Sequence, residues 1–510
     1  MHQAGSGFTA DRSRTLPPAR FSFGILAAAA RGIALAMLWV VVLPDGAHAQ
    51  GDLDNSGSQN AAQEDMARSV DRICPTLDMR SGAQGPRAPN RSAAEDQLNI
   101  VCANLVFNDP ATAPEVDLDA DGEPDVFGFD LDQRELNAAV QSLNGEELQA
   151  TQQQIAEIRA IQVSNISARL SAIRAGQIGP GLSLAGLNLN ASDRLLALQD
   201  LDDFEIVPAQ FEESGFLSRL GLFVTGGLTF GDKDATGTVG GFDFDTQGVT
   251  AGADYRVTDN LVVGAAVGYS RFNADFDTTD ASPSGQELES DGAALSVFGS
   301  FYPTDQLFFD LIASLGWTWY DSTRRIVIPS NNPAIPSIDT DATGDFDALH
   351  YGAAANVGYN LNVFGANVRP IGRVEYLRAE IDGFTEDSSL GVNLTYDDQD
   401  AQSLTTNVGV EMDYPISTGI GVISPSVRAE YVHEFLNNED GVRVSYAIDP
   451  ANASAFELST EDPDRDYGIL GAGLAATFPA GWGAFIDYST VVGLSDFTVH
   501  TVNIGLRREF

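Results

Sequence analysis

Cysteine and histidine are scarce in this chain, and their scarcity limits the chemistry that it can perform. The two cysteines, Cys74 and Cys102, have no histidine between or beside them, so a metal-binding or catalytic role is the less favoured interpretation. After residue 49 the histidines are His350, His433 and His500. Neither an H-E-x-x-H motif nor a complete G-x-S-x-G nucleophile elbow occurs. We therefore expect no enzyme; the alternative is a protease that uses Asp and His at the outer ends of strands, with His433.

Basic residues are also few. Lys and Arg number 28 against 72 Asp and Glu, which gives a formal net charge of -44. Such a chain is repelled by nucleic acid, so a nucleic-acid partner is excluded. The acidic stretch DTDATGDFD at 339–347 would give an outer mouth a negative potential, although solubility of an exposed loop is the favoured explanation for it.

Long apolar runs are missing too, apart from GIALAMLWVVVL at 32–43 near the N-terminus. Its twelve residues are too few for a membrane-spanning helix. Three arginines precede it (Arg12, Arg14 and Arg20), and Ala47-His48-Ala49 follows as a small-x-small cleavage site. We interpret residues 1–49 as a signal peptide, with a transmembrane anchor as the alternative. In the oxidising compartment that export implies, Cys74 and Cys102 are expected to form one disulfide.

What the chain has instead is alternation. From about residue 215 to the end, apolar and polar residues alternate with the period of two that strands show. In the last strand one face carries Val502, Ile504, Leu506 and Phe510. We predict twelve strands, at 217–231, 242–257, 261–277, 289–303, 307–328, 346–361, 366–383, 401–414, 421–437, 465–478, 483–494 and 498–510.

The connections between these strands alternate between short turns, such as TDN at 258–260, and longer polar loops. An outer-membrane barrel has short periplasmic turns and longer outer loops, whereas a soluble sandwich has no such asymmetry. Aromatic residues gather near the strand ends, which favours two interface girdles over core packing. The fold predicted is therefore mainly β: a twelve-stranded antiparallel transmembrane β-barrel, closed by its first and last strands, in contact with outer-membrane lipid.

The region before the barrel has a different composition. Residues 50–131 are rich in small and polar residues and are expected to be loosely structured apart from the two cysteines. Residues 132–175 lack proline and favour helix, interrupted at Asn144-Gly145. A further short helix is predicted to start at Ser192. Because twelve strands enclose a wide lumen, we expect a helix inside it, and the Ser192 helix is preferred over the one at 151–175.

One motif suggests a metal. Within DLDADGEPD at 117–125, the residues Asp117, Asp119, Asp121 and Asp125 are spaced as in calcium loops, and glycine permits the sharp turn. The twelfth position is Gly128 where an EF-hand has glutamate. A calcium site and a solvated acidic linker both remain open, and no other cofactor is expected.

The stretches GVTAGADYRVTDNLVVGAAVGYSRFNADFD at 248–277 and GAFIDYSTVVGLSDFTVHTVNIGLRREF at 483–510 resemble autotransporter β-domains, the type V secretion proteins of Gram-negative bacteria. LNGEELQA at 143–150 is similar to the helix that precedes the barrel in many members. The resemblance covers about 132–510. It implies that Ile504, Leu506 and Phe510 form the signal recognised by the outer-membrane barrel assembly machinery.

We thus expect a signal peptide at 1–49, a Cys-containing segment at 50–131, a helical segment and linker at 132–214, and a barrel at 215–510. The expected function is that of an outer-membrane, monomeric, autotransporter-like barrel that translocates or displays a short N-terminal segment. The alternative is a stand-alone outer-membrane barrel (a pore, adhesin or structural protein) whose helical segment stays periplasmic.

Overall fold

The fold is known from a computed structural model of the 510-residue chain. Two compact units are distinguished, residues 1–49 and 50–510, and all described residues belong to the second. The structure describes residues 66–74, 93–111, 128–145, 148, 150–151, 163–167, 169–170, 219–236, 240–277, 286–436, 442–449, 455–458, 464–478 and 482–509. The predicted signal peptide, calcium motif and Ser192 helix, as well as Phe510, lie outside them.

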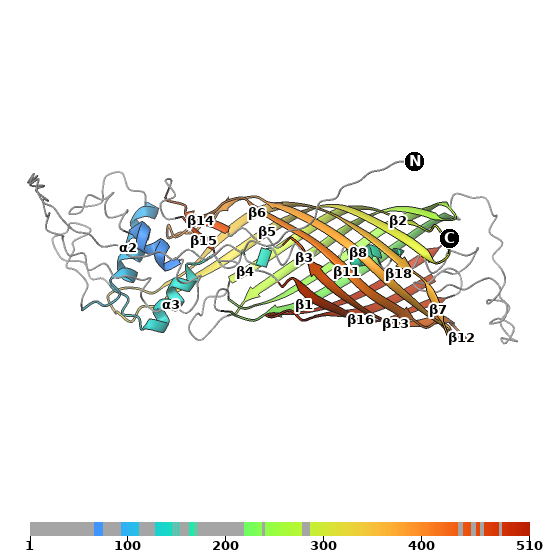
Figure 1. The fold of residues 1–510 in the computed structure, drawn as a ribbon. Coiled ribbons are helices and arrows are strands. Elements are labelled where there is room, and N and C mark those ends of the chain that lie inside the picture. Colours follow the sequence, from blue (N-terminus) through green and yellow to red (C-terminus); the bar gives the residue numbers. More distant parts are fainter. Residues whose placement is uncertain are drawn as a thin grey trace, which may run out of the picture. The chain divides into compact units, whose positions relative to one another are not determined.

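Twelve long antiparallel strands form a closed barrel (Figure 1). Each strand pairs with its sequence neighbour among the twelve, and β18 closes the ring against β1, from Gly221 opposite Glu509 to Lys233 opposite Phe497. The twelve predicted strands are confirmed. Their bounds are β1 Leu220–Lys233, β2 Phe242–Thr258, β3 Leu261–Phe276, β4 Gln286–Phe301, β5 Leu307–Ile328, β6 Ile338–Tyr359, β8 Ala366–Ile381, β11 Gln399–Asp413, β13 Gly421–Glu434, β16 Asp466–Phe478, β17 Trp482–Val492 and β18 Phe497–Glu509.

The two ends of the barrel differ in their connections. At the short-turn end, which includes the turns at 259–260 and 302–306 and the start of β1, the strands are joined tightly. There two hairpins carry small extra strands, β7 Leu361–Val363 and β12 Ile416–Thr418. At the long-loop end, a separate four-stranded sheet is built from β9 Phe384–Thr385, β10 Leu394–Tyr396, β14 Val442–Tyr446 and β15 Phe456–Leu458.

Side chains alternate between the lumen and the outer surface. On β3, Val262 and Ala266 are buried inside while Val263 and Val267 are exposed outside. Exposing large apolar side chains to water is unfavourable, so an outer surface of this kind indicates that the barrel is surrounded by lipid. Of the expected girdle residues, six face outward (Phe301, Trp317, Trp319, Tyr359, Tyr414 and Trp482), whereas Tyr302 and Tyr320 are buried.

The prediction was wrong for the start of β6. The sequence predicts an exposed loop at 339–347, yet β6 begins at Ile338 and pairs with β5 throughout. Its carboxylates point outward while Ala342 and Phe346 point inward. This part of β6 extends beyond the lipid-facing surface, and its outward side chains contact water. The outward residues there are polar, so the apolar residues that reveal a strand in the sequence stop before the strand ends.

The expectation of a loosely structured segment at 50–131 does not hold for residues 66–74 or for α2 Ala93–Val106, which are helical. These helices bury apolar side chains in one core with the long-loop end, including Met66, Ile73 and Leu98. Burial against the barrel, rather than helix propensity alone, stabilises them. Among the described residues, no helix combines the length and the apolar content that crossing a membrane requires.

The third helix, α3 Gln133–Ser142, begins at an N-cap residue. Asp132 accepts hydrogen bonds from the backbone N–H groups of Arg134 (2.8 Å) and Glu135 (3.0 Å). Glu135 in turn accepts one from the Asp132 N–H at 2.8 Å, which completes a capping box. The helix ends at Ser142, and helical backbone resumes at 150–151, so the predicted interruption at Asn144-Gly145 is confirmed.

Candidate functional site

A buried ion pair lies where the N-terminal helices meet the long-loop end of the barrel. Arg324 of β5 and Glu386, which follows β9, both have side chains with 0% exposure. The guanidinium contacts both carboxylate oxygens, Nε at 2.9 Å from Oε1 and Nη2 at Oε2. Glu386 also accepts hydrogen bonds from the Leu394 N–H at 2.8 Å and the Tyr396 hydroxyl at 3.1 Å. A buried ion pair is stable only when its remaining polar atoms are satisfied, and this one meets that requirement.

The same guanidinium holds the end of α3. Nη1 of Arg324 donates to the carbonyls of Ser142 (3.4 Å) and Leu143 (3.1 Å), and Gln286, its cross-strand neighbour on β4, donates to the carbonyl of Asn144 at 3.0 Å. The last carbonyls of a helix lack partners within the helix and carry its partial negative charge. Barrel side chains therefore supply both the hydrogen bonds and the cation that this helix end needs.

Four stacked aromatic rings border this contact. Tyr320 stacks on Phe346, Phe346 on Phe384, and Phe384 on Tyr396, with centroid separations of 4.5, 4.5 and 4.6 Å. The last ring fits against Gly145, where an added Cβ would lie 2.1 Å from the Tyr396 hydroxyl oxygen. Glycine is thus required at 145 for close approach of the chain to the stack.

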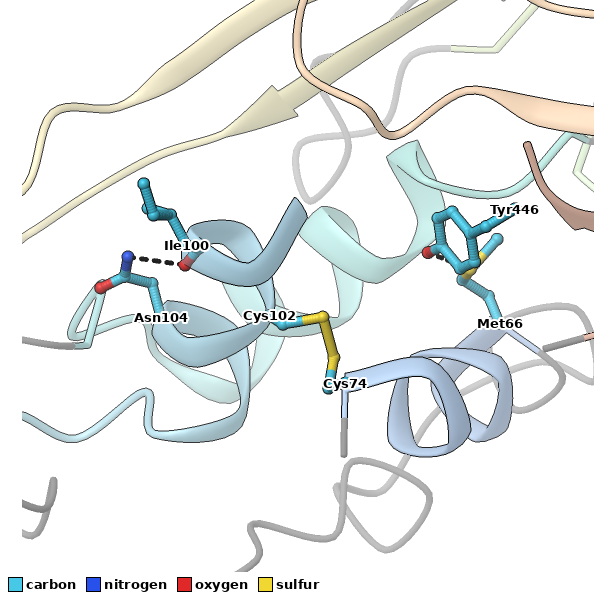
Figure 2. The surroundings of a disulfide bond; sticks show 6 residues. All are labelled: Met66, Cys74, Ile100, Cys102, Asn104 and Tyr446. Atoms are coloured by element: carbon cyan, nitrogen blue, oxygen red, sulfur yellow. Dashed lines mark hydrogen bonds between the residues drawn. A yellow bond between two sulfur atoms is a disulfide. The ribbon is translucent and has the colours of Figure 1, made fainter. Parts of the chain in front are cut away.

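The disulfide joins the two N-terminal helices beside the small sheet (Figure 2). Cys74 ends the helix at 66–74, and Cys102 lies within α2. At the other end of the first helix, the Tyr446 hydroxyl of β14 donates to the sulfur of Met66 at 3.5 Å. Burial raises the pKa of Tyr446, which therefore stays a neutral donor. The sulfur bridge and this contact together fix both helices on the sheet.

The loop before α3 is bound to the β5–β6 connection. The side-chain amide of Asn331 donates to the carbonyl of Asp130 (3.0 Å) and to Glu135 (2.9 Å), and that of Asn332 donates to the carbonyl of Gly128 (2.9 Å). Gly128 has a φ of +96°, a backbone conformation that favours glycine. We call residues 66–74, 93–111 and 128–151, as far as they are described, the cap.

Inside the barrel lies the helical stretch of residues 163–167 and 169–170. Its apolar side chains, Val163, Ile166 and Leu170, pack in a buried cluster with residues of β1, β3, β4, β5, β6 and β8. Asn165 donates to the Thr250 hydroxyl at 3.0 Å, and Asn503 of β18 donates to Ser164 at 3.1 Å. The stretch belongs to the helix at 151–175, the alternative occupant of the lumen; the Ser192 helix lies outside the described residues.

An arginine lies next to the last described residue of this helix. Arg169 is buried and forms an ion pair with Asp254 of β2, with Nε 2.5 Å from Oδ2. Its guanidinium lies over the Phe223 ring, 5.5 Å from the centroid, and next to Gly221 of β1. Asp254 and Gly221 are paired residues at the short-turn end. The chain therefore meets the long-loop end at 142–144 and the short-turn end at 169.

The opposite wall of the lumen carries charges. Arg369 of β8 pairs with Glu411 (3.1 Å) and Asp413 (2.8 Å) of β11, and Arg373 of β8 pairs with Glu430 of β13 at 2.9 Å. The helix thus packs mainly on apolar side chains, with the Arg169–Asp254 ion pair near the short-turn end, whereas β8, β11 and β13 carry ion pairs among their own side chains. Polar, ion-paired lining is typical of the interior of a membrane barrel.

The sequence-predicted site residues fall in separate places. Ile504 and Leu506 are on the outer face of β18, with 56% and 61% exposure, far in the chain from the cysteines of the cap. Arg508, on the same face, lies over the Trp482 ring at 5.0 Å from its centroid. His433 faces outward and binds Asp466, Nδ1 to Oδ1 2.7 Å, together with the Tyr431 hydroxyl. In the described part of the chain, no group of three or more potential ligands is arranged to hold a metal.

Sequence reasoning missed Arg324 and Glu386, the residues that join cap and barrel. Arg324 is on the inward face of β5, between Ser322 and Ile326. An arginine at an inward position of a predicted strand was the available signal, since a buried cation needs a partner. Glu386 lies in a loop whose path no periodicity reveals.

Comparison of the sequence with known proteins identifies the family to which the chain belongs. A model of the autotransporter beta-domain matches residues 222–489, which is 268 of the 510 residues. Outer membrane protein B of Rickettsia typhi is 22% identical over 355 residues, 65% of this chain and 21% of that protein. Esterase EstA of Pseudomonas aeruginosa is 22% identical over 256 residues, 50% of this chain and 37% of the esterase.

Among solved structures, the translocator domain of the autotransporter NalP from Neisseria meningitidis aligns with 62% of this chain and 98% of its own, at 15% identity and a TM-score of 0.45. The chain spans about a fifth of the first curated relative and about a third of the second. Because the family model matches more than half of it, the chain belongs to the autotransporter β-domain family and is an outer-membrane β-barrel of a Gram-negative bacterium.

Proposed function

We propose that this barrel displays its own N-terminal cap on the cell surface and retains it there. The observation that carries the proposal is the path of the chain. Residues 142–144 bind Arg324 and Gln286 at the long-loop end, while Arg169 binds Asp254 at the short-turn end. In outer-membrane barrels the long loops are extracellular and the short turns periplasmic. A chain that runs from one to the other inside the lumen has its N-terminal side outside the cell.

Retention follows from the nature of the contact. The cap and the long-loop end share one apolar core rather than two. Undocking would expose apolar surface and remove the helix carbonyls to which the buried guanidinium of Arg324 donates. The alternative, a periplasmic cap, would require the cap to leave this core and pass to the other end of the barrel.

In this proposal the protein acts by binding and presentation, and no catalytic step is assigned to it. Among the described residues at the outer end, His433 pairs with Asp466 on the outer face of the wall, where Asp466 also accepts from the Tyr431 hydroxyl. This pair is better explained as a surface cluster than as the dyad of a protease. The calcium motif at Asp117, Asp119, Asp121 and Asp125 stays a proposal for the segment between α2 and α3.

Surface display of the cap can be tested by chemical labelling of lysine, because the chain contains so few lysines. The chain has a single lysine, Lys233, and it is buried. Ala111→Lys adds an exposed amine to the cap, and Asp305→Lys adds a matched one to the short turn between β4 and β5. Intact cells are treated with a membrane-impermeant amine reagent, and modified peptides are identified by mass spectrometry. Display predicts modification at 111 and protection at 305, with both modified in disrupted cells. Protection at 111 in intact cells would reject the proposal.

We further propose that the outer-membrane barrel assembly machinery recognises Ile504 and Leu506 on the outer face of β18 together with the terminal residue Phe510. The exposure of Ile504 and Leu506 beside the closing seam supports this. Phe510→Asp should abolish heat-modifiable barrel in outer-membrane fractions, whereas Phe435→Asp, an exposed aromatic beyond β13, should not. Equal amounts of assembled barrel in both variants would count against the proposal.

A further inference from the structure

The turn between β7 and β8 has an unusual backbone. Phe364 and Gly365 both have positive φ angles, +54° and +86°. Two-residue hairpin turns of this kind favour Asn-Gly, because asparagine and glycine tolerate the left-handed region. A bulky aromatic residue in that region is a genuine outlier, since its Cβ crowds the backbone. Such strain persists only where something else favours the residue.

Contacts with the described part of the chain do not supply that compensation. The Phe364 side chain is 99% exposed. Two other short turns have polar tips, Thr258-Asp259-Asn260 and the Pro-Thr-Asp-Gln sequence at 303–306. Asparagine at 364 would relieve the backbone and suit water, so the aromatic ring is better suited to a medium other than water.

Apolar side chains surround the turn on two adjacent hairpins. The exposed members of this hairpin patch are Leu361, Val363, Phe364, Tyr414, Ile416 and Ile420. Leu361 pairs with Val368 and Val363 with Ala366, on the outward side of β8. The Tyr414 ring lies 3.6 Å from where a Cβ on Gly365 would be, so the end of β11 lies next to the tip of the β7–β8 hairpin.

The hairpin patch is continuous with the lipid-facing surface. Along β11 the outward residues Val408, Val410 and Met412 are exposed and lead directly to Tyr414, one of the outward girdle aromatics. A girdle aromatic marks the level of the headgroups. The tip of the β7–β8 hairpin therefore begins at the membrane interface rather than in the periplasm.

We propose that the β7–β8 hairpin inserts Phe364 into the headgroup–acyl boundary of the inner leaflet of the outer membrane. Transfer of the ring from water into this boundary compensates the strained φ. The hairpin patch is then a lipid-binding anchor on one side of the periplasmic rim, whereas the polar turns elsewhere on that rim contact water. This inference does not depend on where the cap lies.

Spin labelling of the mature full-length chain in proteoliposomes tests the anchor. Phe364→Cys and, as control, Asp305→Cys each carry a nitroxide; the disulfide-bonded Cys74 and Cys102 do not react. Collision with oxygen, which concentrates in lipid, is compared with collision with a water-soluble nickel complex. We expect an oxygen-to-nickel ratio several-fold higher at 364 than at 305. Equal ratios would overturn the proposal and would point to a periplasmic protein partner instead.

A second variant tests the anchor independently, through the direction in which the thermal midpoint changes. Phe364→Asn creates the favoured Asn-Gly turn, so without lipid contact it should raise the thermal midpoint of the barrel in liposomes. With the anchor, the gain in backbone energy is opposed by the lost burial of the ring, and we expect the midpoint to fall. A rise in the midpoint would contradict insertion.

Discussion

Arg324 on β5 and Leu143 at the end of α3 are 181 residues apart in the chain, yet Nη1 of the first donates to the backbone carbonyl of the second at 3.1 Å. This hydrogen bond joins the cap to the barrel wall. The same guanidinium is neutralised by Glu386, so one side chain connects a strand, a loop and a helix terminus.

Removing one partner of the buried pair should undock the cap. Arg324→Leu leaves Glu386 buried without its cation, which costs about 3–5 kcal/mol. The double variant Arg324→Leu with Glu386→Leu should be less destabilised than Arg324→Leu alone, because no charge stays unpaired. Hydrogen exchange of α3 amides in the purified protein measures both. Native-like protection of α3 in the single variant would refute the role of the pair.

Gly145 should not accept a larger residue. In Gly145→Ala the new Cβ would lie 2.1 Å from the Tyr396 hydroxyl oxygen, so the chain must shift away from the aromatic stack. Overpacking of this kind costs about 1–3 kcal/mol. Tyr396→Phe removes that oxygen and should partly rescue Gly145→Ala, as judged by protease resistance of the cap. Additive losses in the double variant would show that the two residues do not oppose each other.

The parts of the fold that could be predicted from the sequence are those in which neighbouring residues contact different surroundings. Strand alternation located all twelve strands, because lipid and lumen impose opposite demands on successive residues. It lost β6 between Ile338 and Asp345, where the outward face meets water and carries carboxylates. Composition found α3 but not the helix at 66–74 or α2, since those owe their stability to burial against distant parts of the chain.

The site itself depended on long-range contacts. Cys74 and Cys102 could be paired from their number and compartment, and the structure joins them. The contact of Arg324 with the α3 carbonyls could not be predicted from the sequence, because helix termini and loop carboxylates leave no periodic pattern in it. For the lumen, the structure places the apolar seam of Val163, Ile166 and Leu170 against the barrel wall. The Ser192 helix, which sequence distance favoured, lies outside the described residues and stays a prediction.

The disulfide should stabilise the cap and leave the barrel unchanged. Cys74 and Cys102 are separated by 28 residues, and reopening a loop of such length lowers stability by about 2–4 kcal/mol. Reduction should therefore increase hydrogen exchange in α2 and not in the barrel strands. Peptides linked through these cysteines should appear only in non-reducing digests; two freely alkylatable thiols without reductant would disprove the bond.

Acid should weaken the cap through Asp132. Hydrogen bonds from the backbone N–H groups of Glu135 and then Arg134 hold the pKa of Asp132 below its usual value. A lowered pKa in the folded state means that the stabilisation is complete above about pH 4, the ordinary aspartate pKa, and is lost as pH falls through the folded value. Pepsin cleavage of α3 should therefore accelerate at low pH.

Asp132→Asn is the matched control for this effect, because asparagine keeps an N-cap oxygen without the titrating charge. In that variant the rate of pepsin cleavage of α3 should depend less on pH. Near pH 4 it should be higher than in the native chain. Identical pH profiles in the two proteins would remove Asp132 from the explanation.

The central claim is that the chain passes through the barrel from the long-loop end to the short-turn end, and a cross-link inside the lumen tests it most directly. Asn165 and Thr250 are in hydrogen-bond contact at 3.0 Å, whereas Ser424 lies on β13, in the wall that carries the lumen's ion pairs. With Asn165→Cys, a short thiol cross-linker should join residue 165 to Thr250→Cys and not to Ser424→Cys in folded barrel from outer membranes. Absence of the 165–250 link, or an equal yield at 424, would contradict a threaded lumen.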